Sequence, residues 1–184
     1  MLQYLSDRMY DEVRGPGLTY GVSMSASVTE GRLTLGLTRS SRLSEAYETI
    51  REILKRFIQN ENEWDITLTD SAKGSMIYSW AEKEETVEDL VGQTVKAYMR
   101  GTDSKYNRQF VRTLGRVQLE SIKFVAQKFL PLFLSEDTSQ TAIVCNPASI
   151  KEIVEDFKKF GIELTTYDTL EENFSDVTER EDIL

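Results

Sequence analysis

The chain has 184 residues, of which 40% are hydrophobic, and it carries 22 basic and 31 acidic residues without a histidine. This hydrophobic content is enough for one domain with a core, and a net charge of −9 argues against nucleic-acid binding, because such a chain repels a phosphate backbone. The lack of histidine excludes the commonest general base, the commonest zinc ligand and every Ser–His or Cys–His nucleophile pair.

The first third of the chain is predicted to form a helix followed by a β-hairpin. The helix has an apolar face at helical spacing, made of Leu2, Leu5, Met9 and Val13. The run Gly15-Pro-Gly17 ends it, because proline lacks an N–H group and glycine tolerates positive φ. Apolar residues then alternate with polar or small ones over residues 18–28 and, after a turn at 29–31, over residues 32–38, which predicts two paired strands.

The middle of the chain is predicted to be helical. Ser44 is the expected N-cap of a helix whose apolar stripe reaches Ile58, and a polar loop follows at residues 59–63. Further helical segments are predicted from Asp70 or Ser71 to Trp80, from Thr86 to Met99, and from Tyr106 to Phe129 with a bend at Gly115 and an end at Pro131.

The last third is predicted to form a strand, a helix and a second strand. These segments are residues 140–145, 147–160 and 162–167. Such a βαβ order places the two strands in one sheet. The predicted fold is therefore an α/β (α+β) two-layer sandwich, with helices packed on one mixed sheet of about four strands. It fills a single domain, residues 1–173, and an acidic, frayed tail follows at residues 174–184.

The cysteine content and the apolar runs bear on the compartment. Cys145 is the only cysteine and is expected to be a buried structural thiol, which favours a reducing compartment. No apolar stretch reaches the length of about 18 residues that a membrane span needs. The first residues show neither a basic region nor a hydrophobic core, so no signal peptide is expected there. The expected location is the cytoplasm, with the mitochondrion as the alternative.

The segment Arg14-Gly-Pro-Gly-Leu-Thr-Tyr20-Gly21 resembles the arginine–tyrosine segment in the C-terminal half of pitrilysin-type zinc metallopeptidases, the inverzincins. The spacing from Arg14 to Tyr20 is similar to that of the presequence-protease branch, in which a glycine-rich turn separates the pair. The likeness continues in collinear order at residues 71–80, 84–86, 125–133 and 161–164. It covers about residues 1–167 of the chain.

The resemblance implies a place within a larger protein. Members of this family carry four related α/β domains, arranged as two halves of a clamshell around a peptide chamber, with the zinc site in the first domain. This chain would be the fourth, C-terminal domain, and its partners would be the N-terminal catalytic half and a peptide substrate. Family domains enter the first helix from preceding strands, so the domain is expected to be truncated at its N-terminus and to expose a sheet edge that favours self-association.

The resemblance also assigns roles to Arg14 and Tyr20, and the two glycines between them are further candidates. Arg14 and Tyr20 would donate hydrogen bonds to the substrate backbone near the scissile bond, and Gly15 and Gly17 would let the main chain approach the ligand. Plainer explanations stay open. Arg14 also suits the C-terminus of a helix, Tyr20 suits a strand, and a turn alone requires the glycines.

The remaining polar and aromatic candidates carry no function in this interpretation. The acidic residues at a helix junction are expected to be a solvated surface and not a cation site; they are Glu82, Glu84, Glu85, Glu88 and Asp89. Ser71 and Lys73 have no base partner or nucleophile motif, which argues against hydrolase chemistry of their own. Three aromatic residues, Trp64, Tyr78 and Trp80, are expected to lie in the core.

The sequence therefore predicts a non-zinc, substrate-binding domain of a zinc metalloendopeptidase that degrades peptides. The zinc would be bound by the N-terminal domain of the parent protein, and the isolated chain would be inactive, without a catalytic or metal-binding residue of its own. The alternative is a purely structural interaction domain of a catalytically inactive relative.

Overall fold

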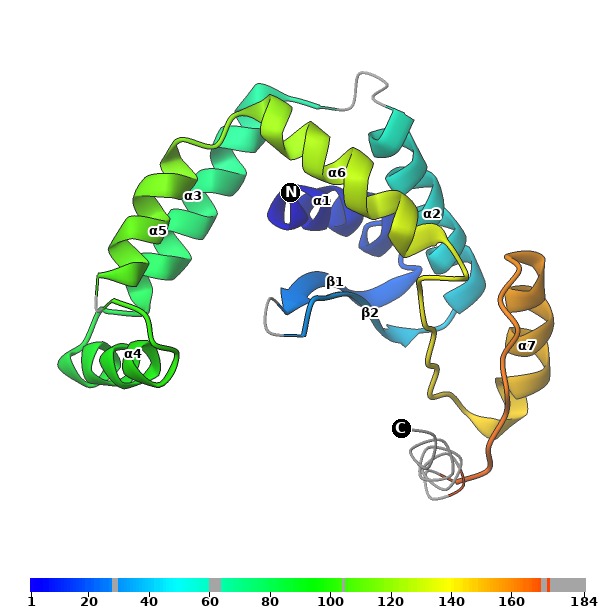
Figure 1. The fold of residues 1–184 in the computed structure, drawn as a ribbon. Coiled ribbons are helices and arrows are strands. Elements are labelled where there is room, and N and C mark those ends of the chain that lie inside the picture. Colours follow the sequence, from blue (N-terminus) through cyan, green and yellow to red (C-terminus); the bar gives the residue numbers. More distant parts are fainter. Residues whose placement is uncertain (28–29, 60–63, 104, 170–171, 173–184) are drawn as a thin grey trace. The chain divides into compact units, whose positions relative to one another are not determined.

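The computed structural model describes residues 1–27, 30–59, 64–103, 105–169 and 172 (Figure 1). The chain divides into two compact units, Met1–Ser135 and Glu136–Leu184. The first unit contains the hydrophobic core together with Arg14 and Tyr20. The predicted tail at residues 174–184 lies outside the described residues.

The first unit begins with a helix and a hairpin. Its elements are α1 (Leu2–Met9), the π-helix η1 (Tyr10–Arg14), β1 (Thr19–Ser27) and β2 (Arg32–Ser40). The two strands pair antiparallel, with Thr19 opposite Ser40 at the open end of the hairpin. The predicted helix end before Gly15 and the predicted hairpin are confirmed, whereas Val28, predicted in the first strand, lies outside the described residues.

Helices follow the hairpin. They are α2 (Leu43–Gln59), α3 (Ile66–Glu82), α4 (Val87–Met99), α5 (Tyr106–Gly115) and α6 (Leu119–Leu134). The predicted cap of α4 is confirmed, since the Thr86 hydroxyl accepts the Asp89 N–H at 3.1 Å. The start of α3 lies earlier than predicted, because Asp65 Oδ1 accepts the Thr67 N–H at 2.6 Å and caps the helix there. Figure 1 shows α3 and α5 side by side.

The predicted end of a helix at Pro131 is wrong, because α6 continues through this proline to Leu134. Proline removes one hydrogen bond of the helix. The neighbouring Leu130 is completely buried, and Phe133 and Leu134 pack against the core. Burial of these side chains offsets the missing bond. The predicted break at Gly115, by contrast, is confirmed as the boundary between α5 and α6.

The hydrophobic core is built on α1, α2, β1 and α6. Its completely buried side chains include Leu5, Met9, Val13, Ile50, Ile53, Leu54, Ala126 and Leu130. Trp64 covers one side of it, as predicted, with its ring centroid 5.2 Å from that of Tyr4 and 4.8 Å from that of Phe57. The prediction for Tyr78 is wrong, since this side chain is 65% exposed. Trp80 is half-buried and stacks on Phe110 of α5.

The second unit contains a short 3₁₀-helix, η2 (Pro147–Ser149), followed by α7 (Ile150–Lys159). The strands predicted at residues 140–145 and 162–167 are absent, and within the described ranges β1 and β2 form the one sheet. Val144 is 96% exposed, and Cys145 is exposed and not buried as predicted. A strand needs a partner for its N–H and C=O groups. Neither segment pairs with another strand among the described residues.

The predicted sandwich with about four strands is therefore wrong. The protein is a mostly helical α+β fold with a two-stranded antiparallel sheet in its described part. Within the same ranges, every helix is too short or too polar to traverse a lipid bilayer.

Candidate functional site

Arg14 is the last residue of the π-helix, and the chain turns sharply after it. The Gly15 N–H donates to the Tyr10 carbonyl oxygen at 3.1 Å, which is the bond of a π-turn. A Cβ atom on Gly15 would lie 2.4 Å from the Asp11 carbonyl oxygen, so this position has no room for a side chain. Gly17 has a φ of +77°, in the left-handed region. The backbone itself thus requires both glycines, and their part in substrate binding stays a prediction.

The contrast between two glycines tests this explanation. Gly17→Ala is expected to lower the free energy of unfolding by about 1 kcal/mol, because an alanine disfavours the left-handed conformation. Gly74 lies inside α3, where a Cβ atom would meet no other atom within 4 Å, so Gly74→Ala is expected to raise the same free energy by about 0.5–1 kcal/mol. Urea unfolding of both variants measures the two values, and an equal sign for both would contradict the explanation.

Tyr20 lies at the open end of the hairpin, where side-chain hydrogen bonds fix the backbone on both sides of the strand pair. The buried Thr19 hydroxyl donates to the Thr38 carbonyl oxygen at 2.9 Å, and the Ser40 hydroxyl donates to the Leu18 carbonyl oxygen at 2.7 Å. These bonds join the two strands in addition to the main-chain ladder. The Tyr20 side chain is nevertheless 61% exposed, so a rigid backbone presents an accessible ring and hydroxyl.

The structure brings Arg14 and Tyr20 together. The Arg14 Cζ atom lies 5.2 Å from the centroid of the Tyr20 ring and 4.7 Å from that of Tyr10. The Cζ atom of Arg39 lies 5.4 Å from the same Tyr20 centroid. We call these four residues, Tyr10, Arg14, Tyr20 and Arg39, the arginine–tyrosine corner. Cation–π contacts of this kind hold a guanidinium group in place without using its N–H donors.

Two members of the corner, Tyr10 and Arg39, are missed by the sequence-based interpretation. Tyr10 precedes Arg14 by four residues, a spacing that brings side chains together on a helix and is a usable signal. The position of Arg39 opposite Tyr20 follows from the register of the hairpin. The pairs Thr19–Ser40 and Gly21–Thr38 leave Arg39 facing Tyr20 across the sheet. To predict this contact one must know which residues of the two strands are paired, and the alternation of apolar and polar residues does not specify the pairing.

The corner offers hydrogen-bond donors with no acid beside them. Within the described part of the chain, neither Arg14 nor Arg39 forms an ion pair, and the Tyr20 hydroxyl has no hydrogen-bond partner. A guanidinium group carries five N–H donors in one plane, and a phenol adds another. The arrangement can therefore bind carbonyl oxygens or an anion.

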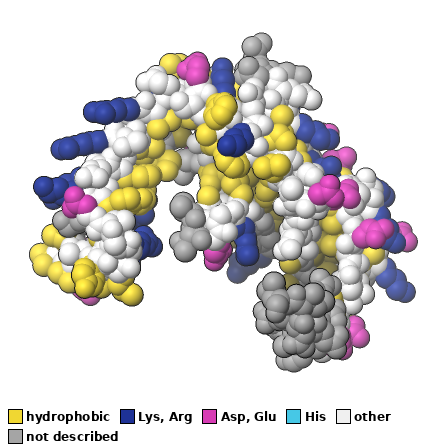
Figure 2. All heavy atoms as spheres, in the orientation of Figure 1, with side chains coloured by type: hydrophobic (Ala, Val, Ile, Leu, Met, Phe, Trp, Pro, Cys, Tyr) yellow, Lys and Arg dark blue, Asp and Glu magenta, His cyan; other side chains and the backbone are white. Residues whose placement is uncertain are grey.

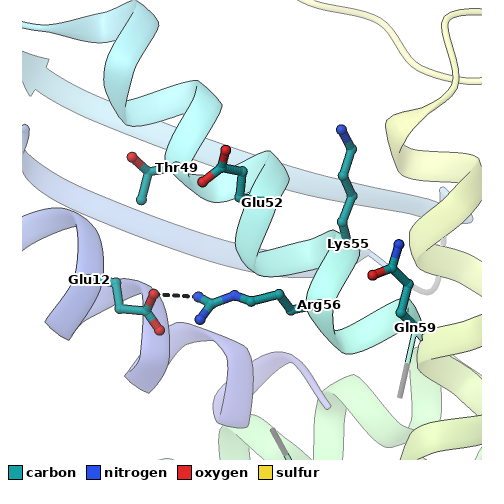
Figure 3. A pocket seen from close by; sticks show the side chains of 6 residues that line it. All are labelled: Glu12, Thr49, Glu52, Lys55, Arg56 and Gln59. Atoms are coloured by element: carbon teal, nitrogen blue, oxygen red, sulfur yellow. Dashed lines mark hydrogen bonds and ion pairs between the residues drawn. The ribbon is translucent and has the colours of Figure 1, made fainter. Parts of the chain in front are cut away.

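A pocket of about 450 Å³ lies between Glu12 of the π-helix and α2 (Figure 3). It is lined by Glu12, Thr49, Glu52, Lys55, Arg56 and Gln59. Figure 3 shows Arg56 reaching from α2 to an ion pair with Glu12. Because both side chains are about one-third exposed, this pair is a modest link between η1 and α2.

The other polar candidates are structural in this fold. Lys73 Nζ lies 2.7 Å from Asp70 Oδ1 and donates to the Val117 carbonyl oxygen at 3.4 Å. Glu84 accepts a hydrogen bond from Asn107 at 2.8 Å and links the start of α5 to the junction before α4. Among the residues that the structure describes, no three His, Cys, Asp or Glu side chains are grouped so that they could hold a metal ion.

Comparison with known proteins gives relatives without a stated function. The chain is 23% identical over 158 residues to the uncharacterized protein C05D11.1 of Caenorhabditis elegans, covering 84% of this chain and 16% of that protein. It is 22% identical over 182 residues to the uncharacterized protein YOL098C of Saccharomyces cerevisiae, covering 98% of this chain and 18% of that protein. It is 23% identical over 156 residues to the uncharacterized protein C3H1.02c of Schizosaccharomyces pombe, covering 83% and 15%.

The chain thus spans less than a fifth of the length of these curated relatives. No protein-family profile matches the sequence, and no solved structure matches it significantly.

Proposed function

We propose that this chain is the non-zinc, substrate-binding C-terminal domain of a clamshell zinc metalloendopeptidase that degrades peptides. The observation that carries the proposal is the contact between the half-buried Arg14 and the exposed Tyr20, with their donor groups unused within the described residues. The resemblance of residues 14–21 to the arginine–tyrosine segment of the inverzincins supports it. So does the π-helix, an element that often occurs at functional sites.

The corner suits the main chain of an extended peptide. The Arg14 guanidinium group would donate to a peptide carbonyl oxygen through its planar edge, while its face rests on Tyr10 and Tyr20. The Tyr20 hydroxyl would donate to a second oxygen, near the bond that is cleaved. The two rings restrict the Arg14 side chain before a substrate arrives, which lowers the entropy that binding costs.

The described residues of this chain do not fit a zinc ion. The sequence has no histidine, and the described residues contain no group of metal-ligating side chains. The zinc would therefore be bound by the N-terminal domain of the parent protein, whose catalytic half would be the partner of this domain. We assign the protein to the cytoplasm, with the mitochondrion as the alternative, because the single cysteine suits a reducing compartment.

Peptide binding by the 184-residue chain tests the proposal. We expect the neutral peptide acetyl-Ala-Leu-Gln-Leu-Ala-amide to bind weakly and to remain uncleaved. Tyr20→Phe is expected to weaken this binding about fivefold, because one hydrogen bond contributes about 1 kcal/mol. Titration of the labelled chain, followed by ¹H–¹⁵N NMR, measures both affinities.

Arg32→Gln is the matched control, because Arg32 lies at the opposite end of the same hairpin and its side chain is 70% exposed. This variant should bind like the unchanged chain. No binding of the peptide, or equal binding by Tyr20→Phe, would contradict the proposed function.

The alternative, a structural interaction domain of an inactive relative, is favoured by α4. This helix has no buried residue, and Val87, Tyr98 and Met99 are each at least 80% exposed. Figure 2 shows apolar side chains gathered over it. The outer edges of β1 and β2 are also unpaired within the described residues, which suits self-association. A purely structural domain predicts no peptide binding at the corner, so the same titration separates the two functions.

A further inference from the structure

Two cationic groups lie over one ring in a protein whose net charge is −9. The Cζ atoms of Arg14 and Arg39 are 5.2 Å and 5.4 Å from the centroid of Tyr20. Like charges this near a common ring repel each other, although the ring itself attracts both. Neither arginine has an acidic partner among the described residues, so their repulsion is not neutralised there. An anion bound at this corner would reduce the repulsion.

Arg39 is held in a conformation that its side chain does not favour. Its φ is +53°, and within the described ranges it is the one residue other than glycine with a positive φ. Glycine or asparagine would adopt this conformation at lower cost. The hydrogen bonds of its neighbours, from Thr19 to Thr38 and from Ser40 to Leu18, hold the backbone on both sides of it. The fold thus keeps an unfavourable arginine at the position that faces Tyr20.

We propose that Arg14, Tyr20 and Arg39 form a carboxylate subsite, which selects peptides that place an acidic side chain or a free C-terminus at this corner. Arg39 is its specificity-determining residue. Two guanidinium groups can donate in-plane pairs of hydrogen bonds to a carboxylate, which a neutral amide accepts less strongly. The inference rests on the proposed function, since it names the substrate class of the same peptide site.

Three capped peptides test the subsite with the unchanged chain. They are acetyl-Ala-Leu-Gln-Leu-Ala-amide, its Glu counterpart acetyl-Ala-Leu-Glu-Leu-Ala-amide, and the acetylated Gln peptide with a free C-terminus. We expect at least one carboxylate peptide to bind about five- to tenfold more tightly than the neutral one in about 25 mM NaCl, and expect the ratio to fall in about 300 mM NaCl. The Glu peptide reports an acidic side chain, and the third peptide reports a terminal carboxylate.

The same titrations with Arg39→Asn identify the residue responsible. Asparagine tolerates the left-handed backbone, so this variant should fold at least as stably as the unchanged chain, and thermal unfolding checks that it does. Its ratio of affinities for carboxylate and neutral peptides is expected to fall to about one. Arg32→Gln, which removes the same charge from the other end of β2, should keep the original ratio.

The outcomes separate this inference from the proposed function. Equal affinities of the unchanged chain for all three peptides would overturn the carboxylate subsite and leave peptide binding intact. A preference that survives in Arg39→Asn would overturn the role of Arg39. Absence of binding by the neutral peptide would contradict the proposed function, and absence of binding by every peptide would overturn the subsite as well.

Discussion

Arg14→Ala in the full-length protein is expected to lower kcat/KM for peptide hydrolysis about 10²–10³-fold, the usual effect of removing one positioned donor at a reacting carbonyl. The guanidinium group contacts two rings and is otherwise unused within the described residues. Under the proposed function, its loss would therefore remove an interaction with substrate. Tyr20→Phe keeps the ring that supports Arg14 and removes the hydroxyl donor alone, and a reduction of similar size is expected. Initial rates at substrate concentrations well below KM measure both.

Stability must be measured alongside turnover. Arg14→Ala removes two exposed cation–π contacts, each worth about 0.5–1 kcal/mol, so the fold should persist. Arg32→Ala, at the other end of the hairpin, is the control and should leave kcat/KM unchanged. If Arg14→Ala and Tyr20→Phe hydrolyse peptides at the original rate, the corner does not hold the substrate.

Phe57→Ala is expected to lower the free energy of unfolding by about 3–5 kcal/mol. Phe57 is 1% exposed on α2, and its ring centroid lies 5.7 Å from that of Tyr4 and 4.8 Å from that of Trp64. Alanine would leave a cavity between α1 and α2 that these rings cannot fill by small movements. Urea unfolding monitored by circular dichroism gives the value.

The same substitution on the surface provides the comparison. Phe124 lies on α6 with its side chain 66% exposed, so Phe124→Ala should change the free energy of unfolding by no more than about 0.5 kcal/mol. A similar loss in the two variants would mean that Phe57 is not part of a packed core.

The elements that can be predicted from the sequence are those specified by neighbouring residues. The first helix, the hairpin and the cap at Thr86 each depend on signals within a few positions of one another. Such local preferences act in the same way in most folds, because capping groups and turn glycines satisfy the nearby backbone.

The wrong predictions concern what a segment packs against. Residues 140–145 and 162–167 have the composition of strands, yet a ladder also needs an adjacent edge, and the sequence pattern does not specify one. The expectation that Tyr78 lies in the core rests on its residue type alone, although its position on α3 leaves it exposed. At Pro131 a local signal is overridden, because the burial of Leu130 and the packing of the following residues keep the helix intact.

Two residues of the candidate site, Arg14 and Tyr20, can be predicted from the sequence, whereas Arg39 cannot. Arg14 and Tyr20 can be identified from the resemblance of their segment, and the structure brings their side chains into contact. Arg39 is far from Tyr20 along the chain, and its place opposite this tyrosine depends on the strand register. The π-helix has no composition that distinguishes it from an α-helix, since its bonds depend on how the chain enters the turn at Gly15.

The π-helix has a consequence for insertions and deletions. A turn closed by a bond from residue i to residue i−5 contains one residue more than an α-helical turn. Removing one residue between Tyr10 and Arg14 would restore α-helical spacing and rotate the arginine by about 100° around the helix axis, away from Tyr20. Exposed side chains such as Asp11 can vary without this effect. The number of residues from Tyr10 to Arg14, more than their identity, therefore maintains the contact between Arg14 and Tyr20.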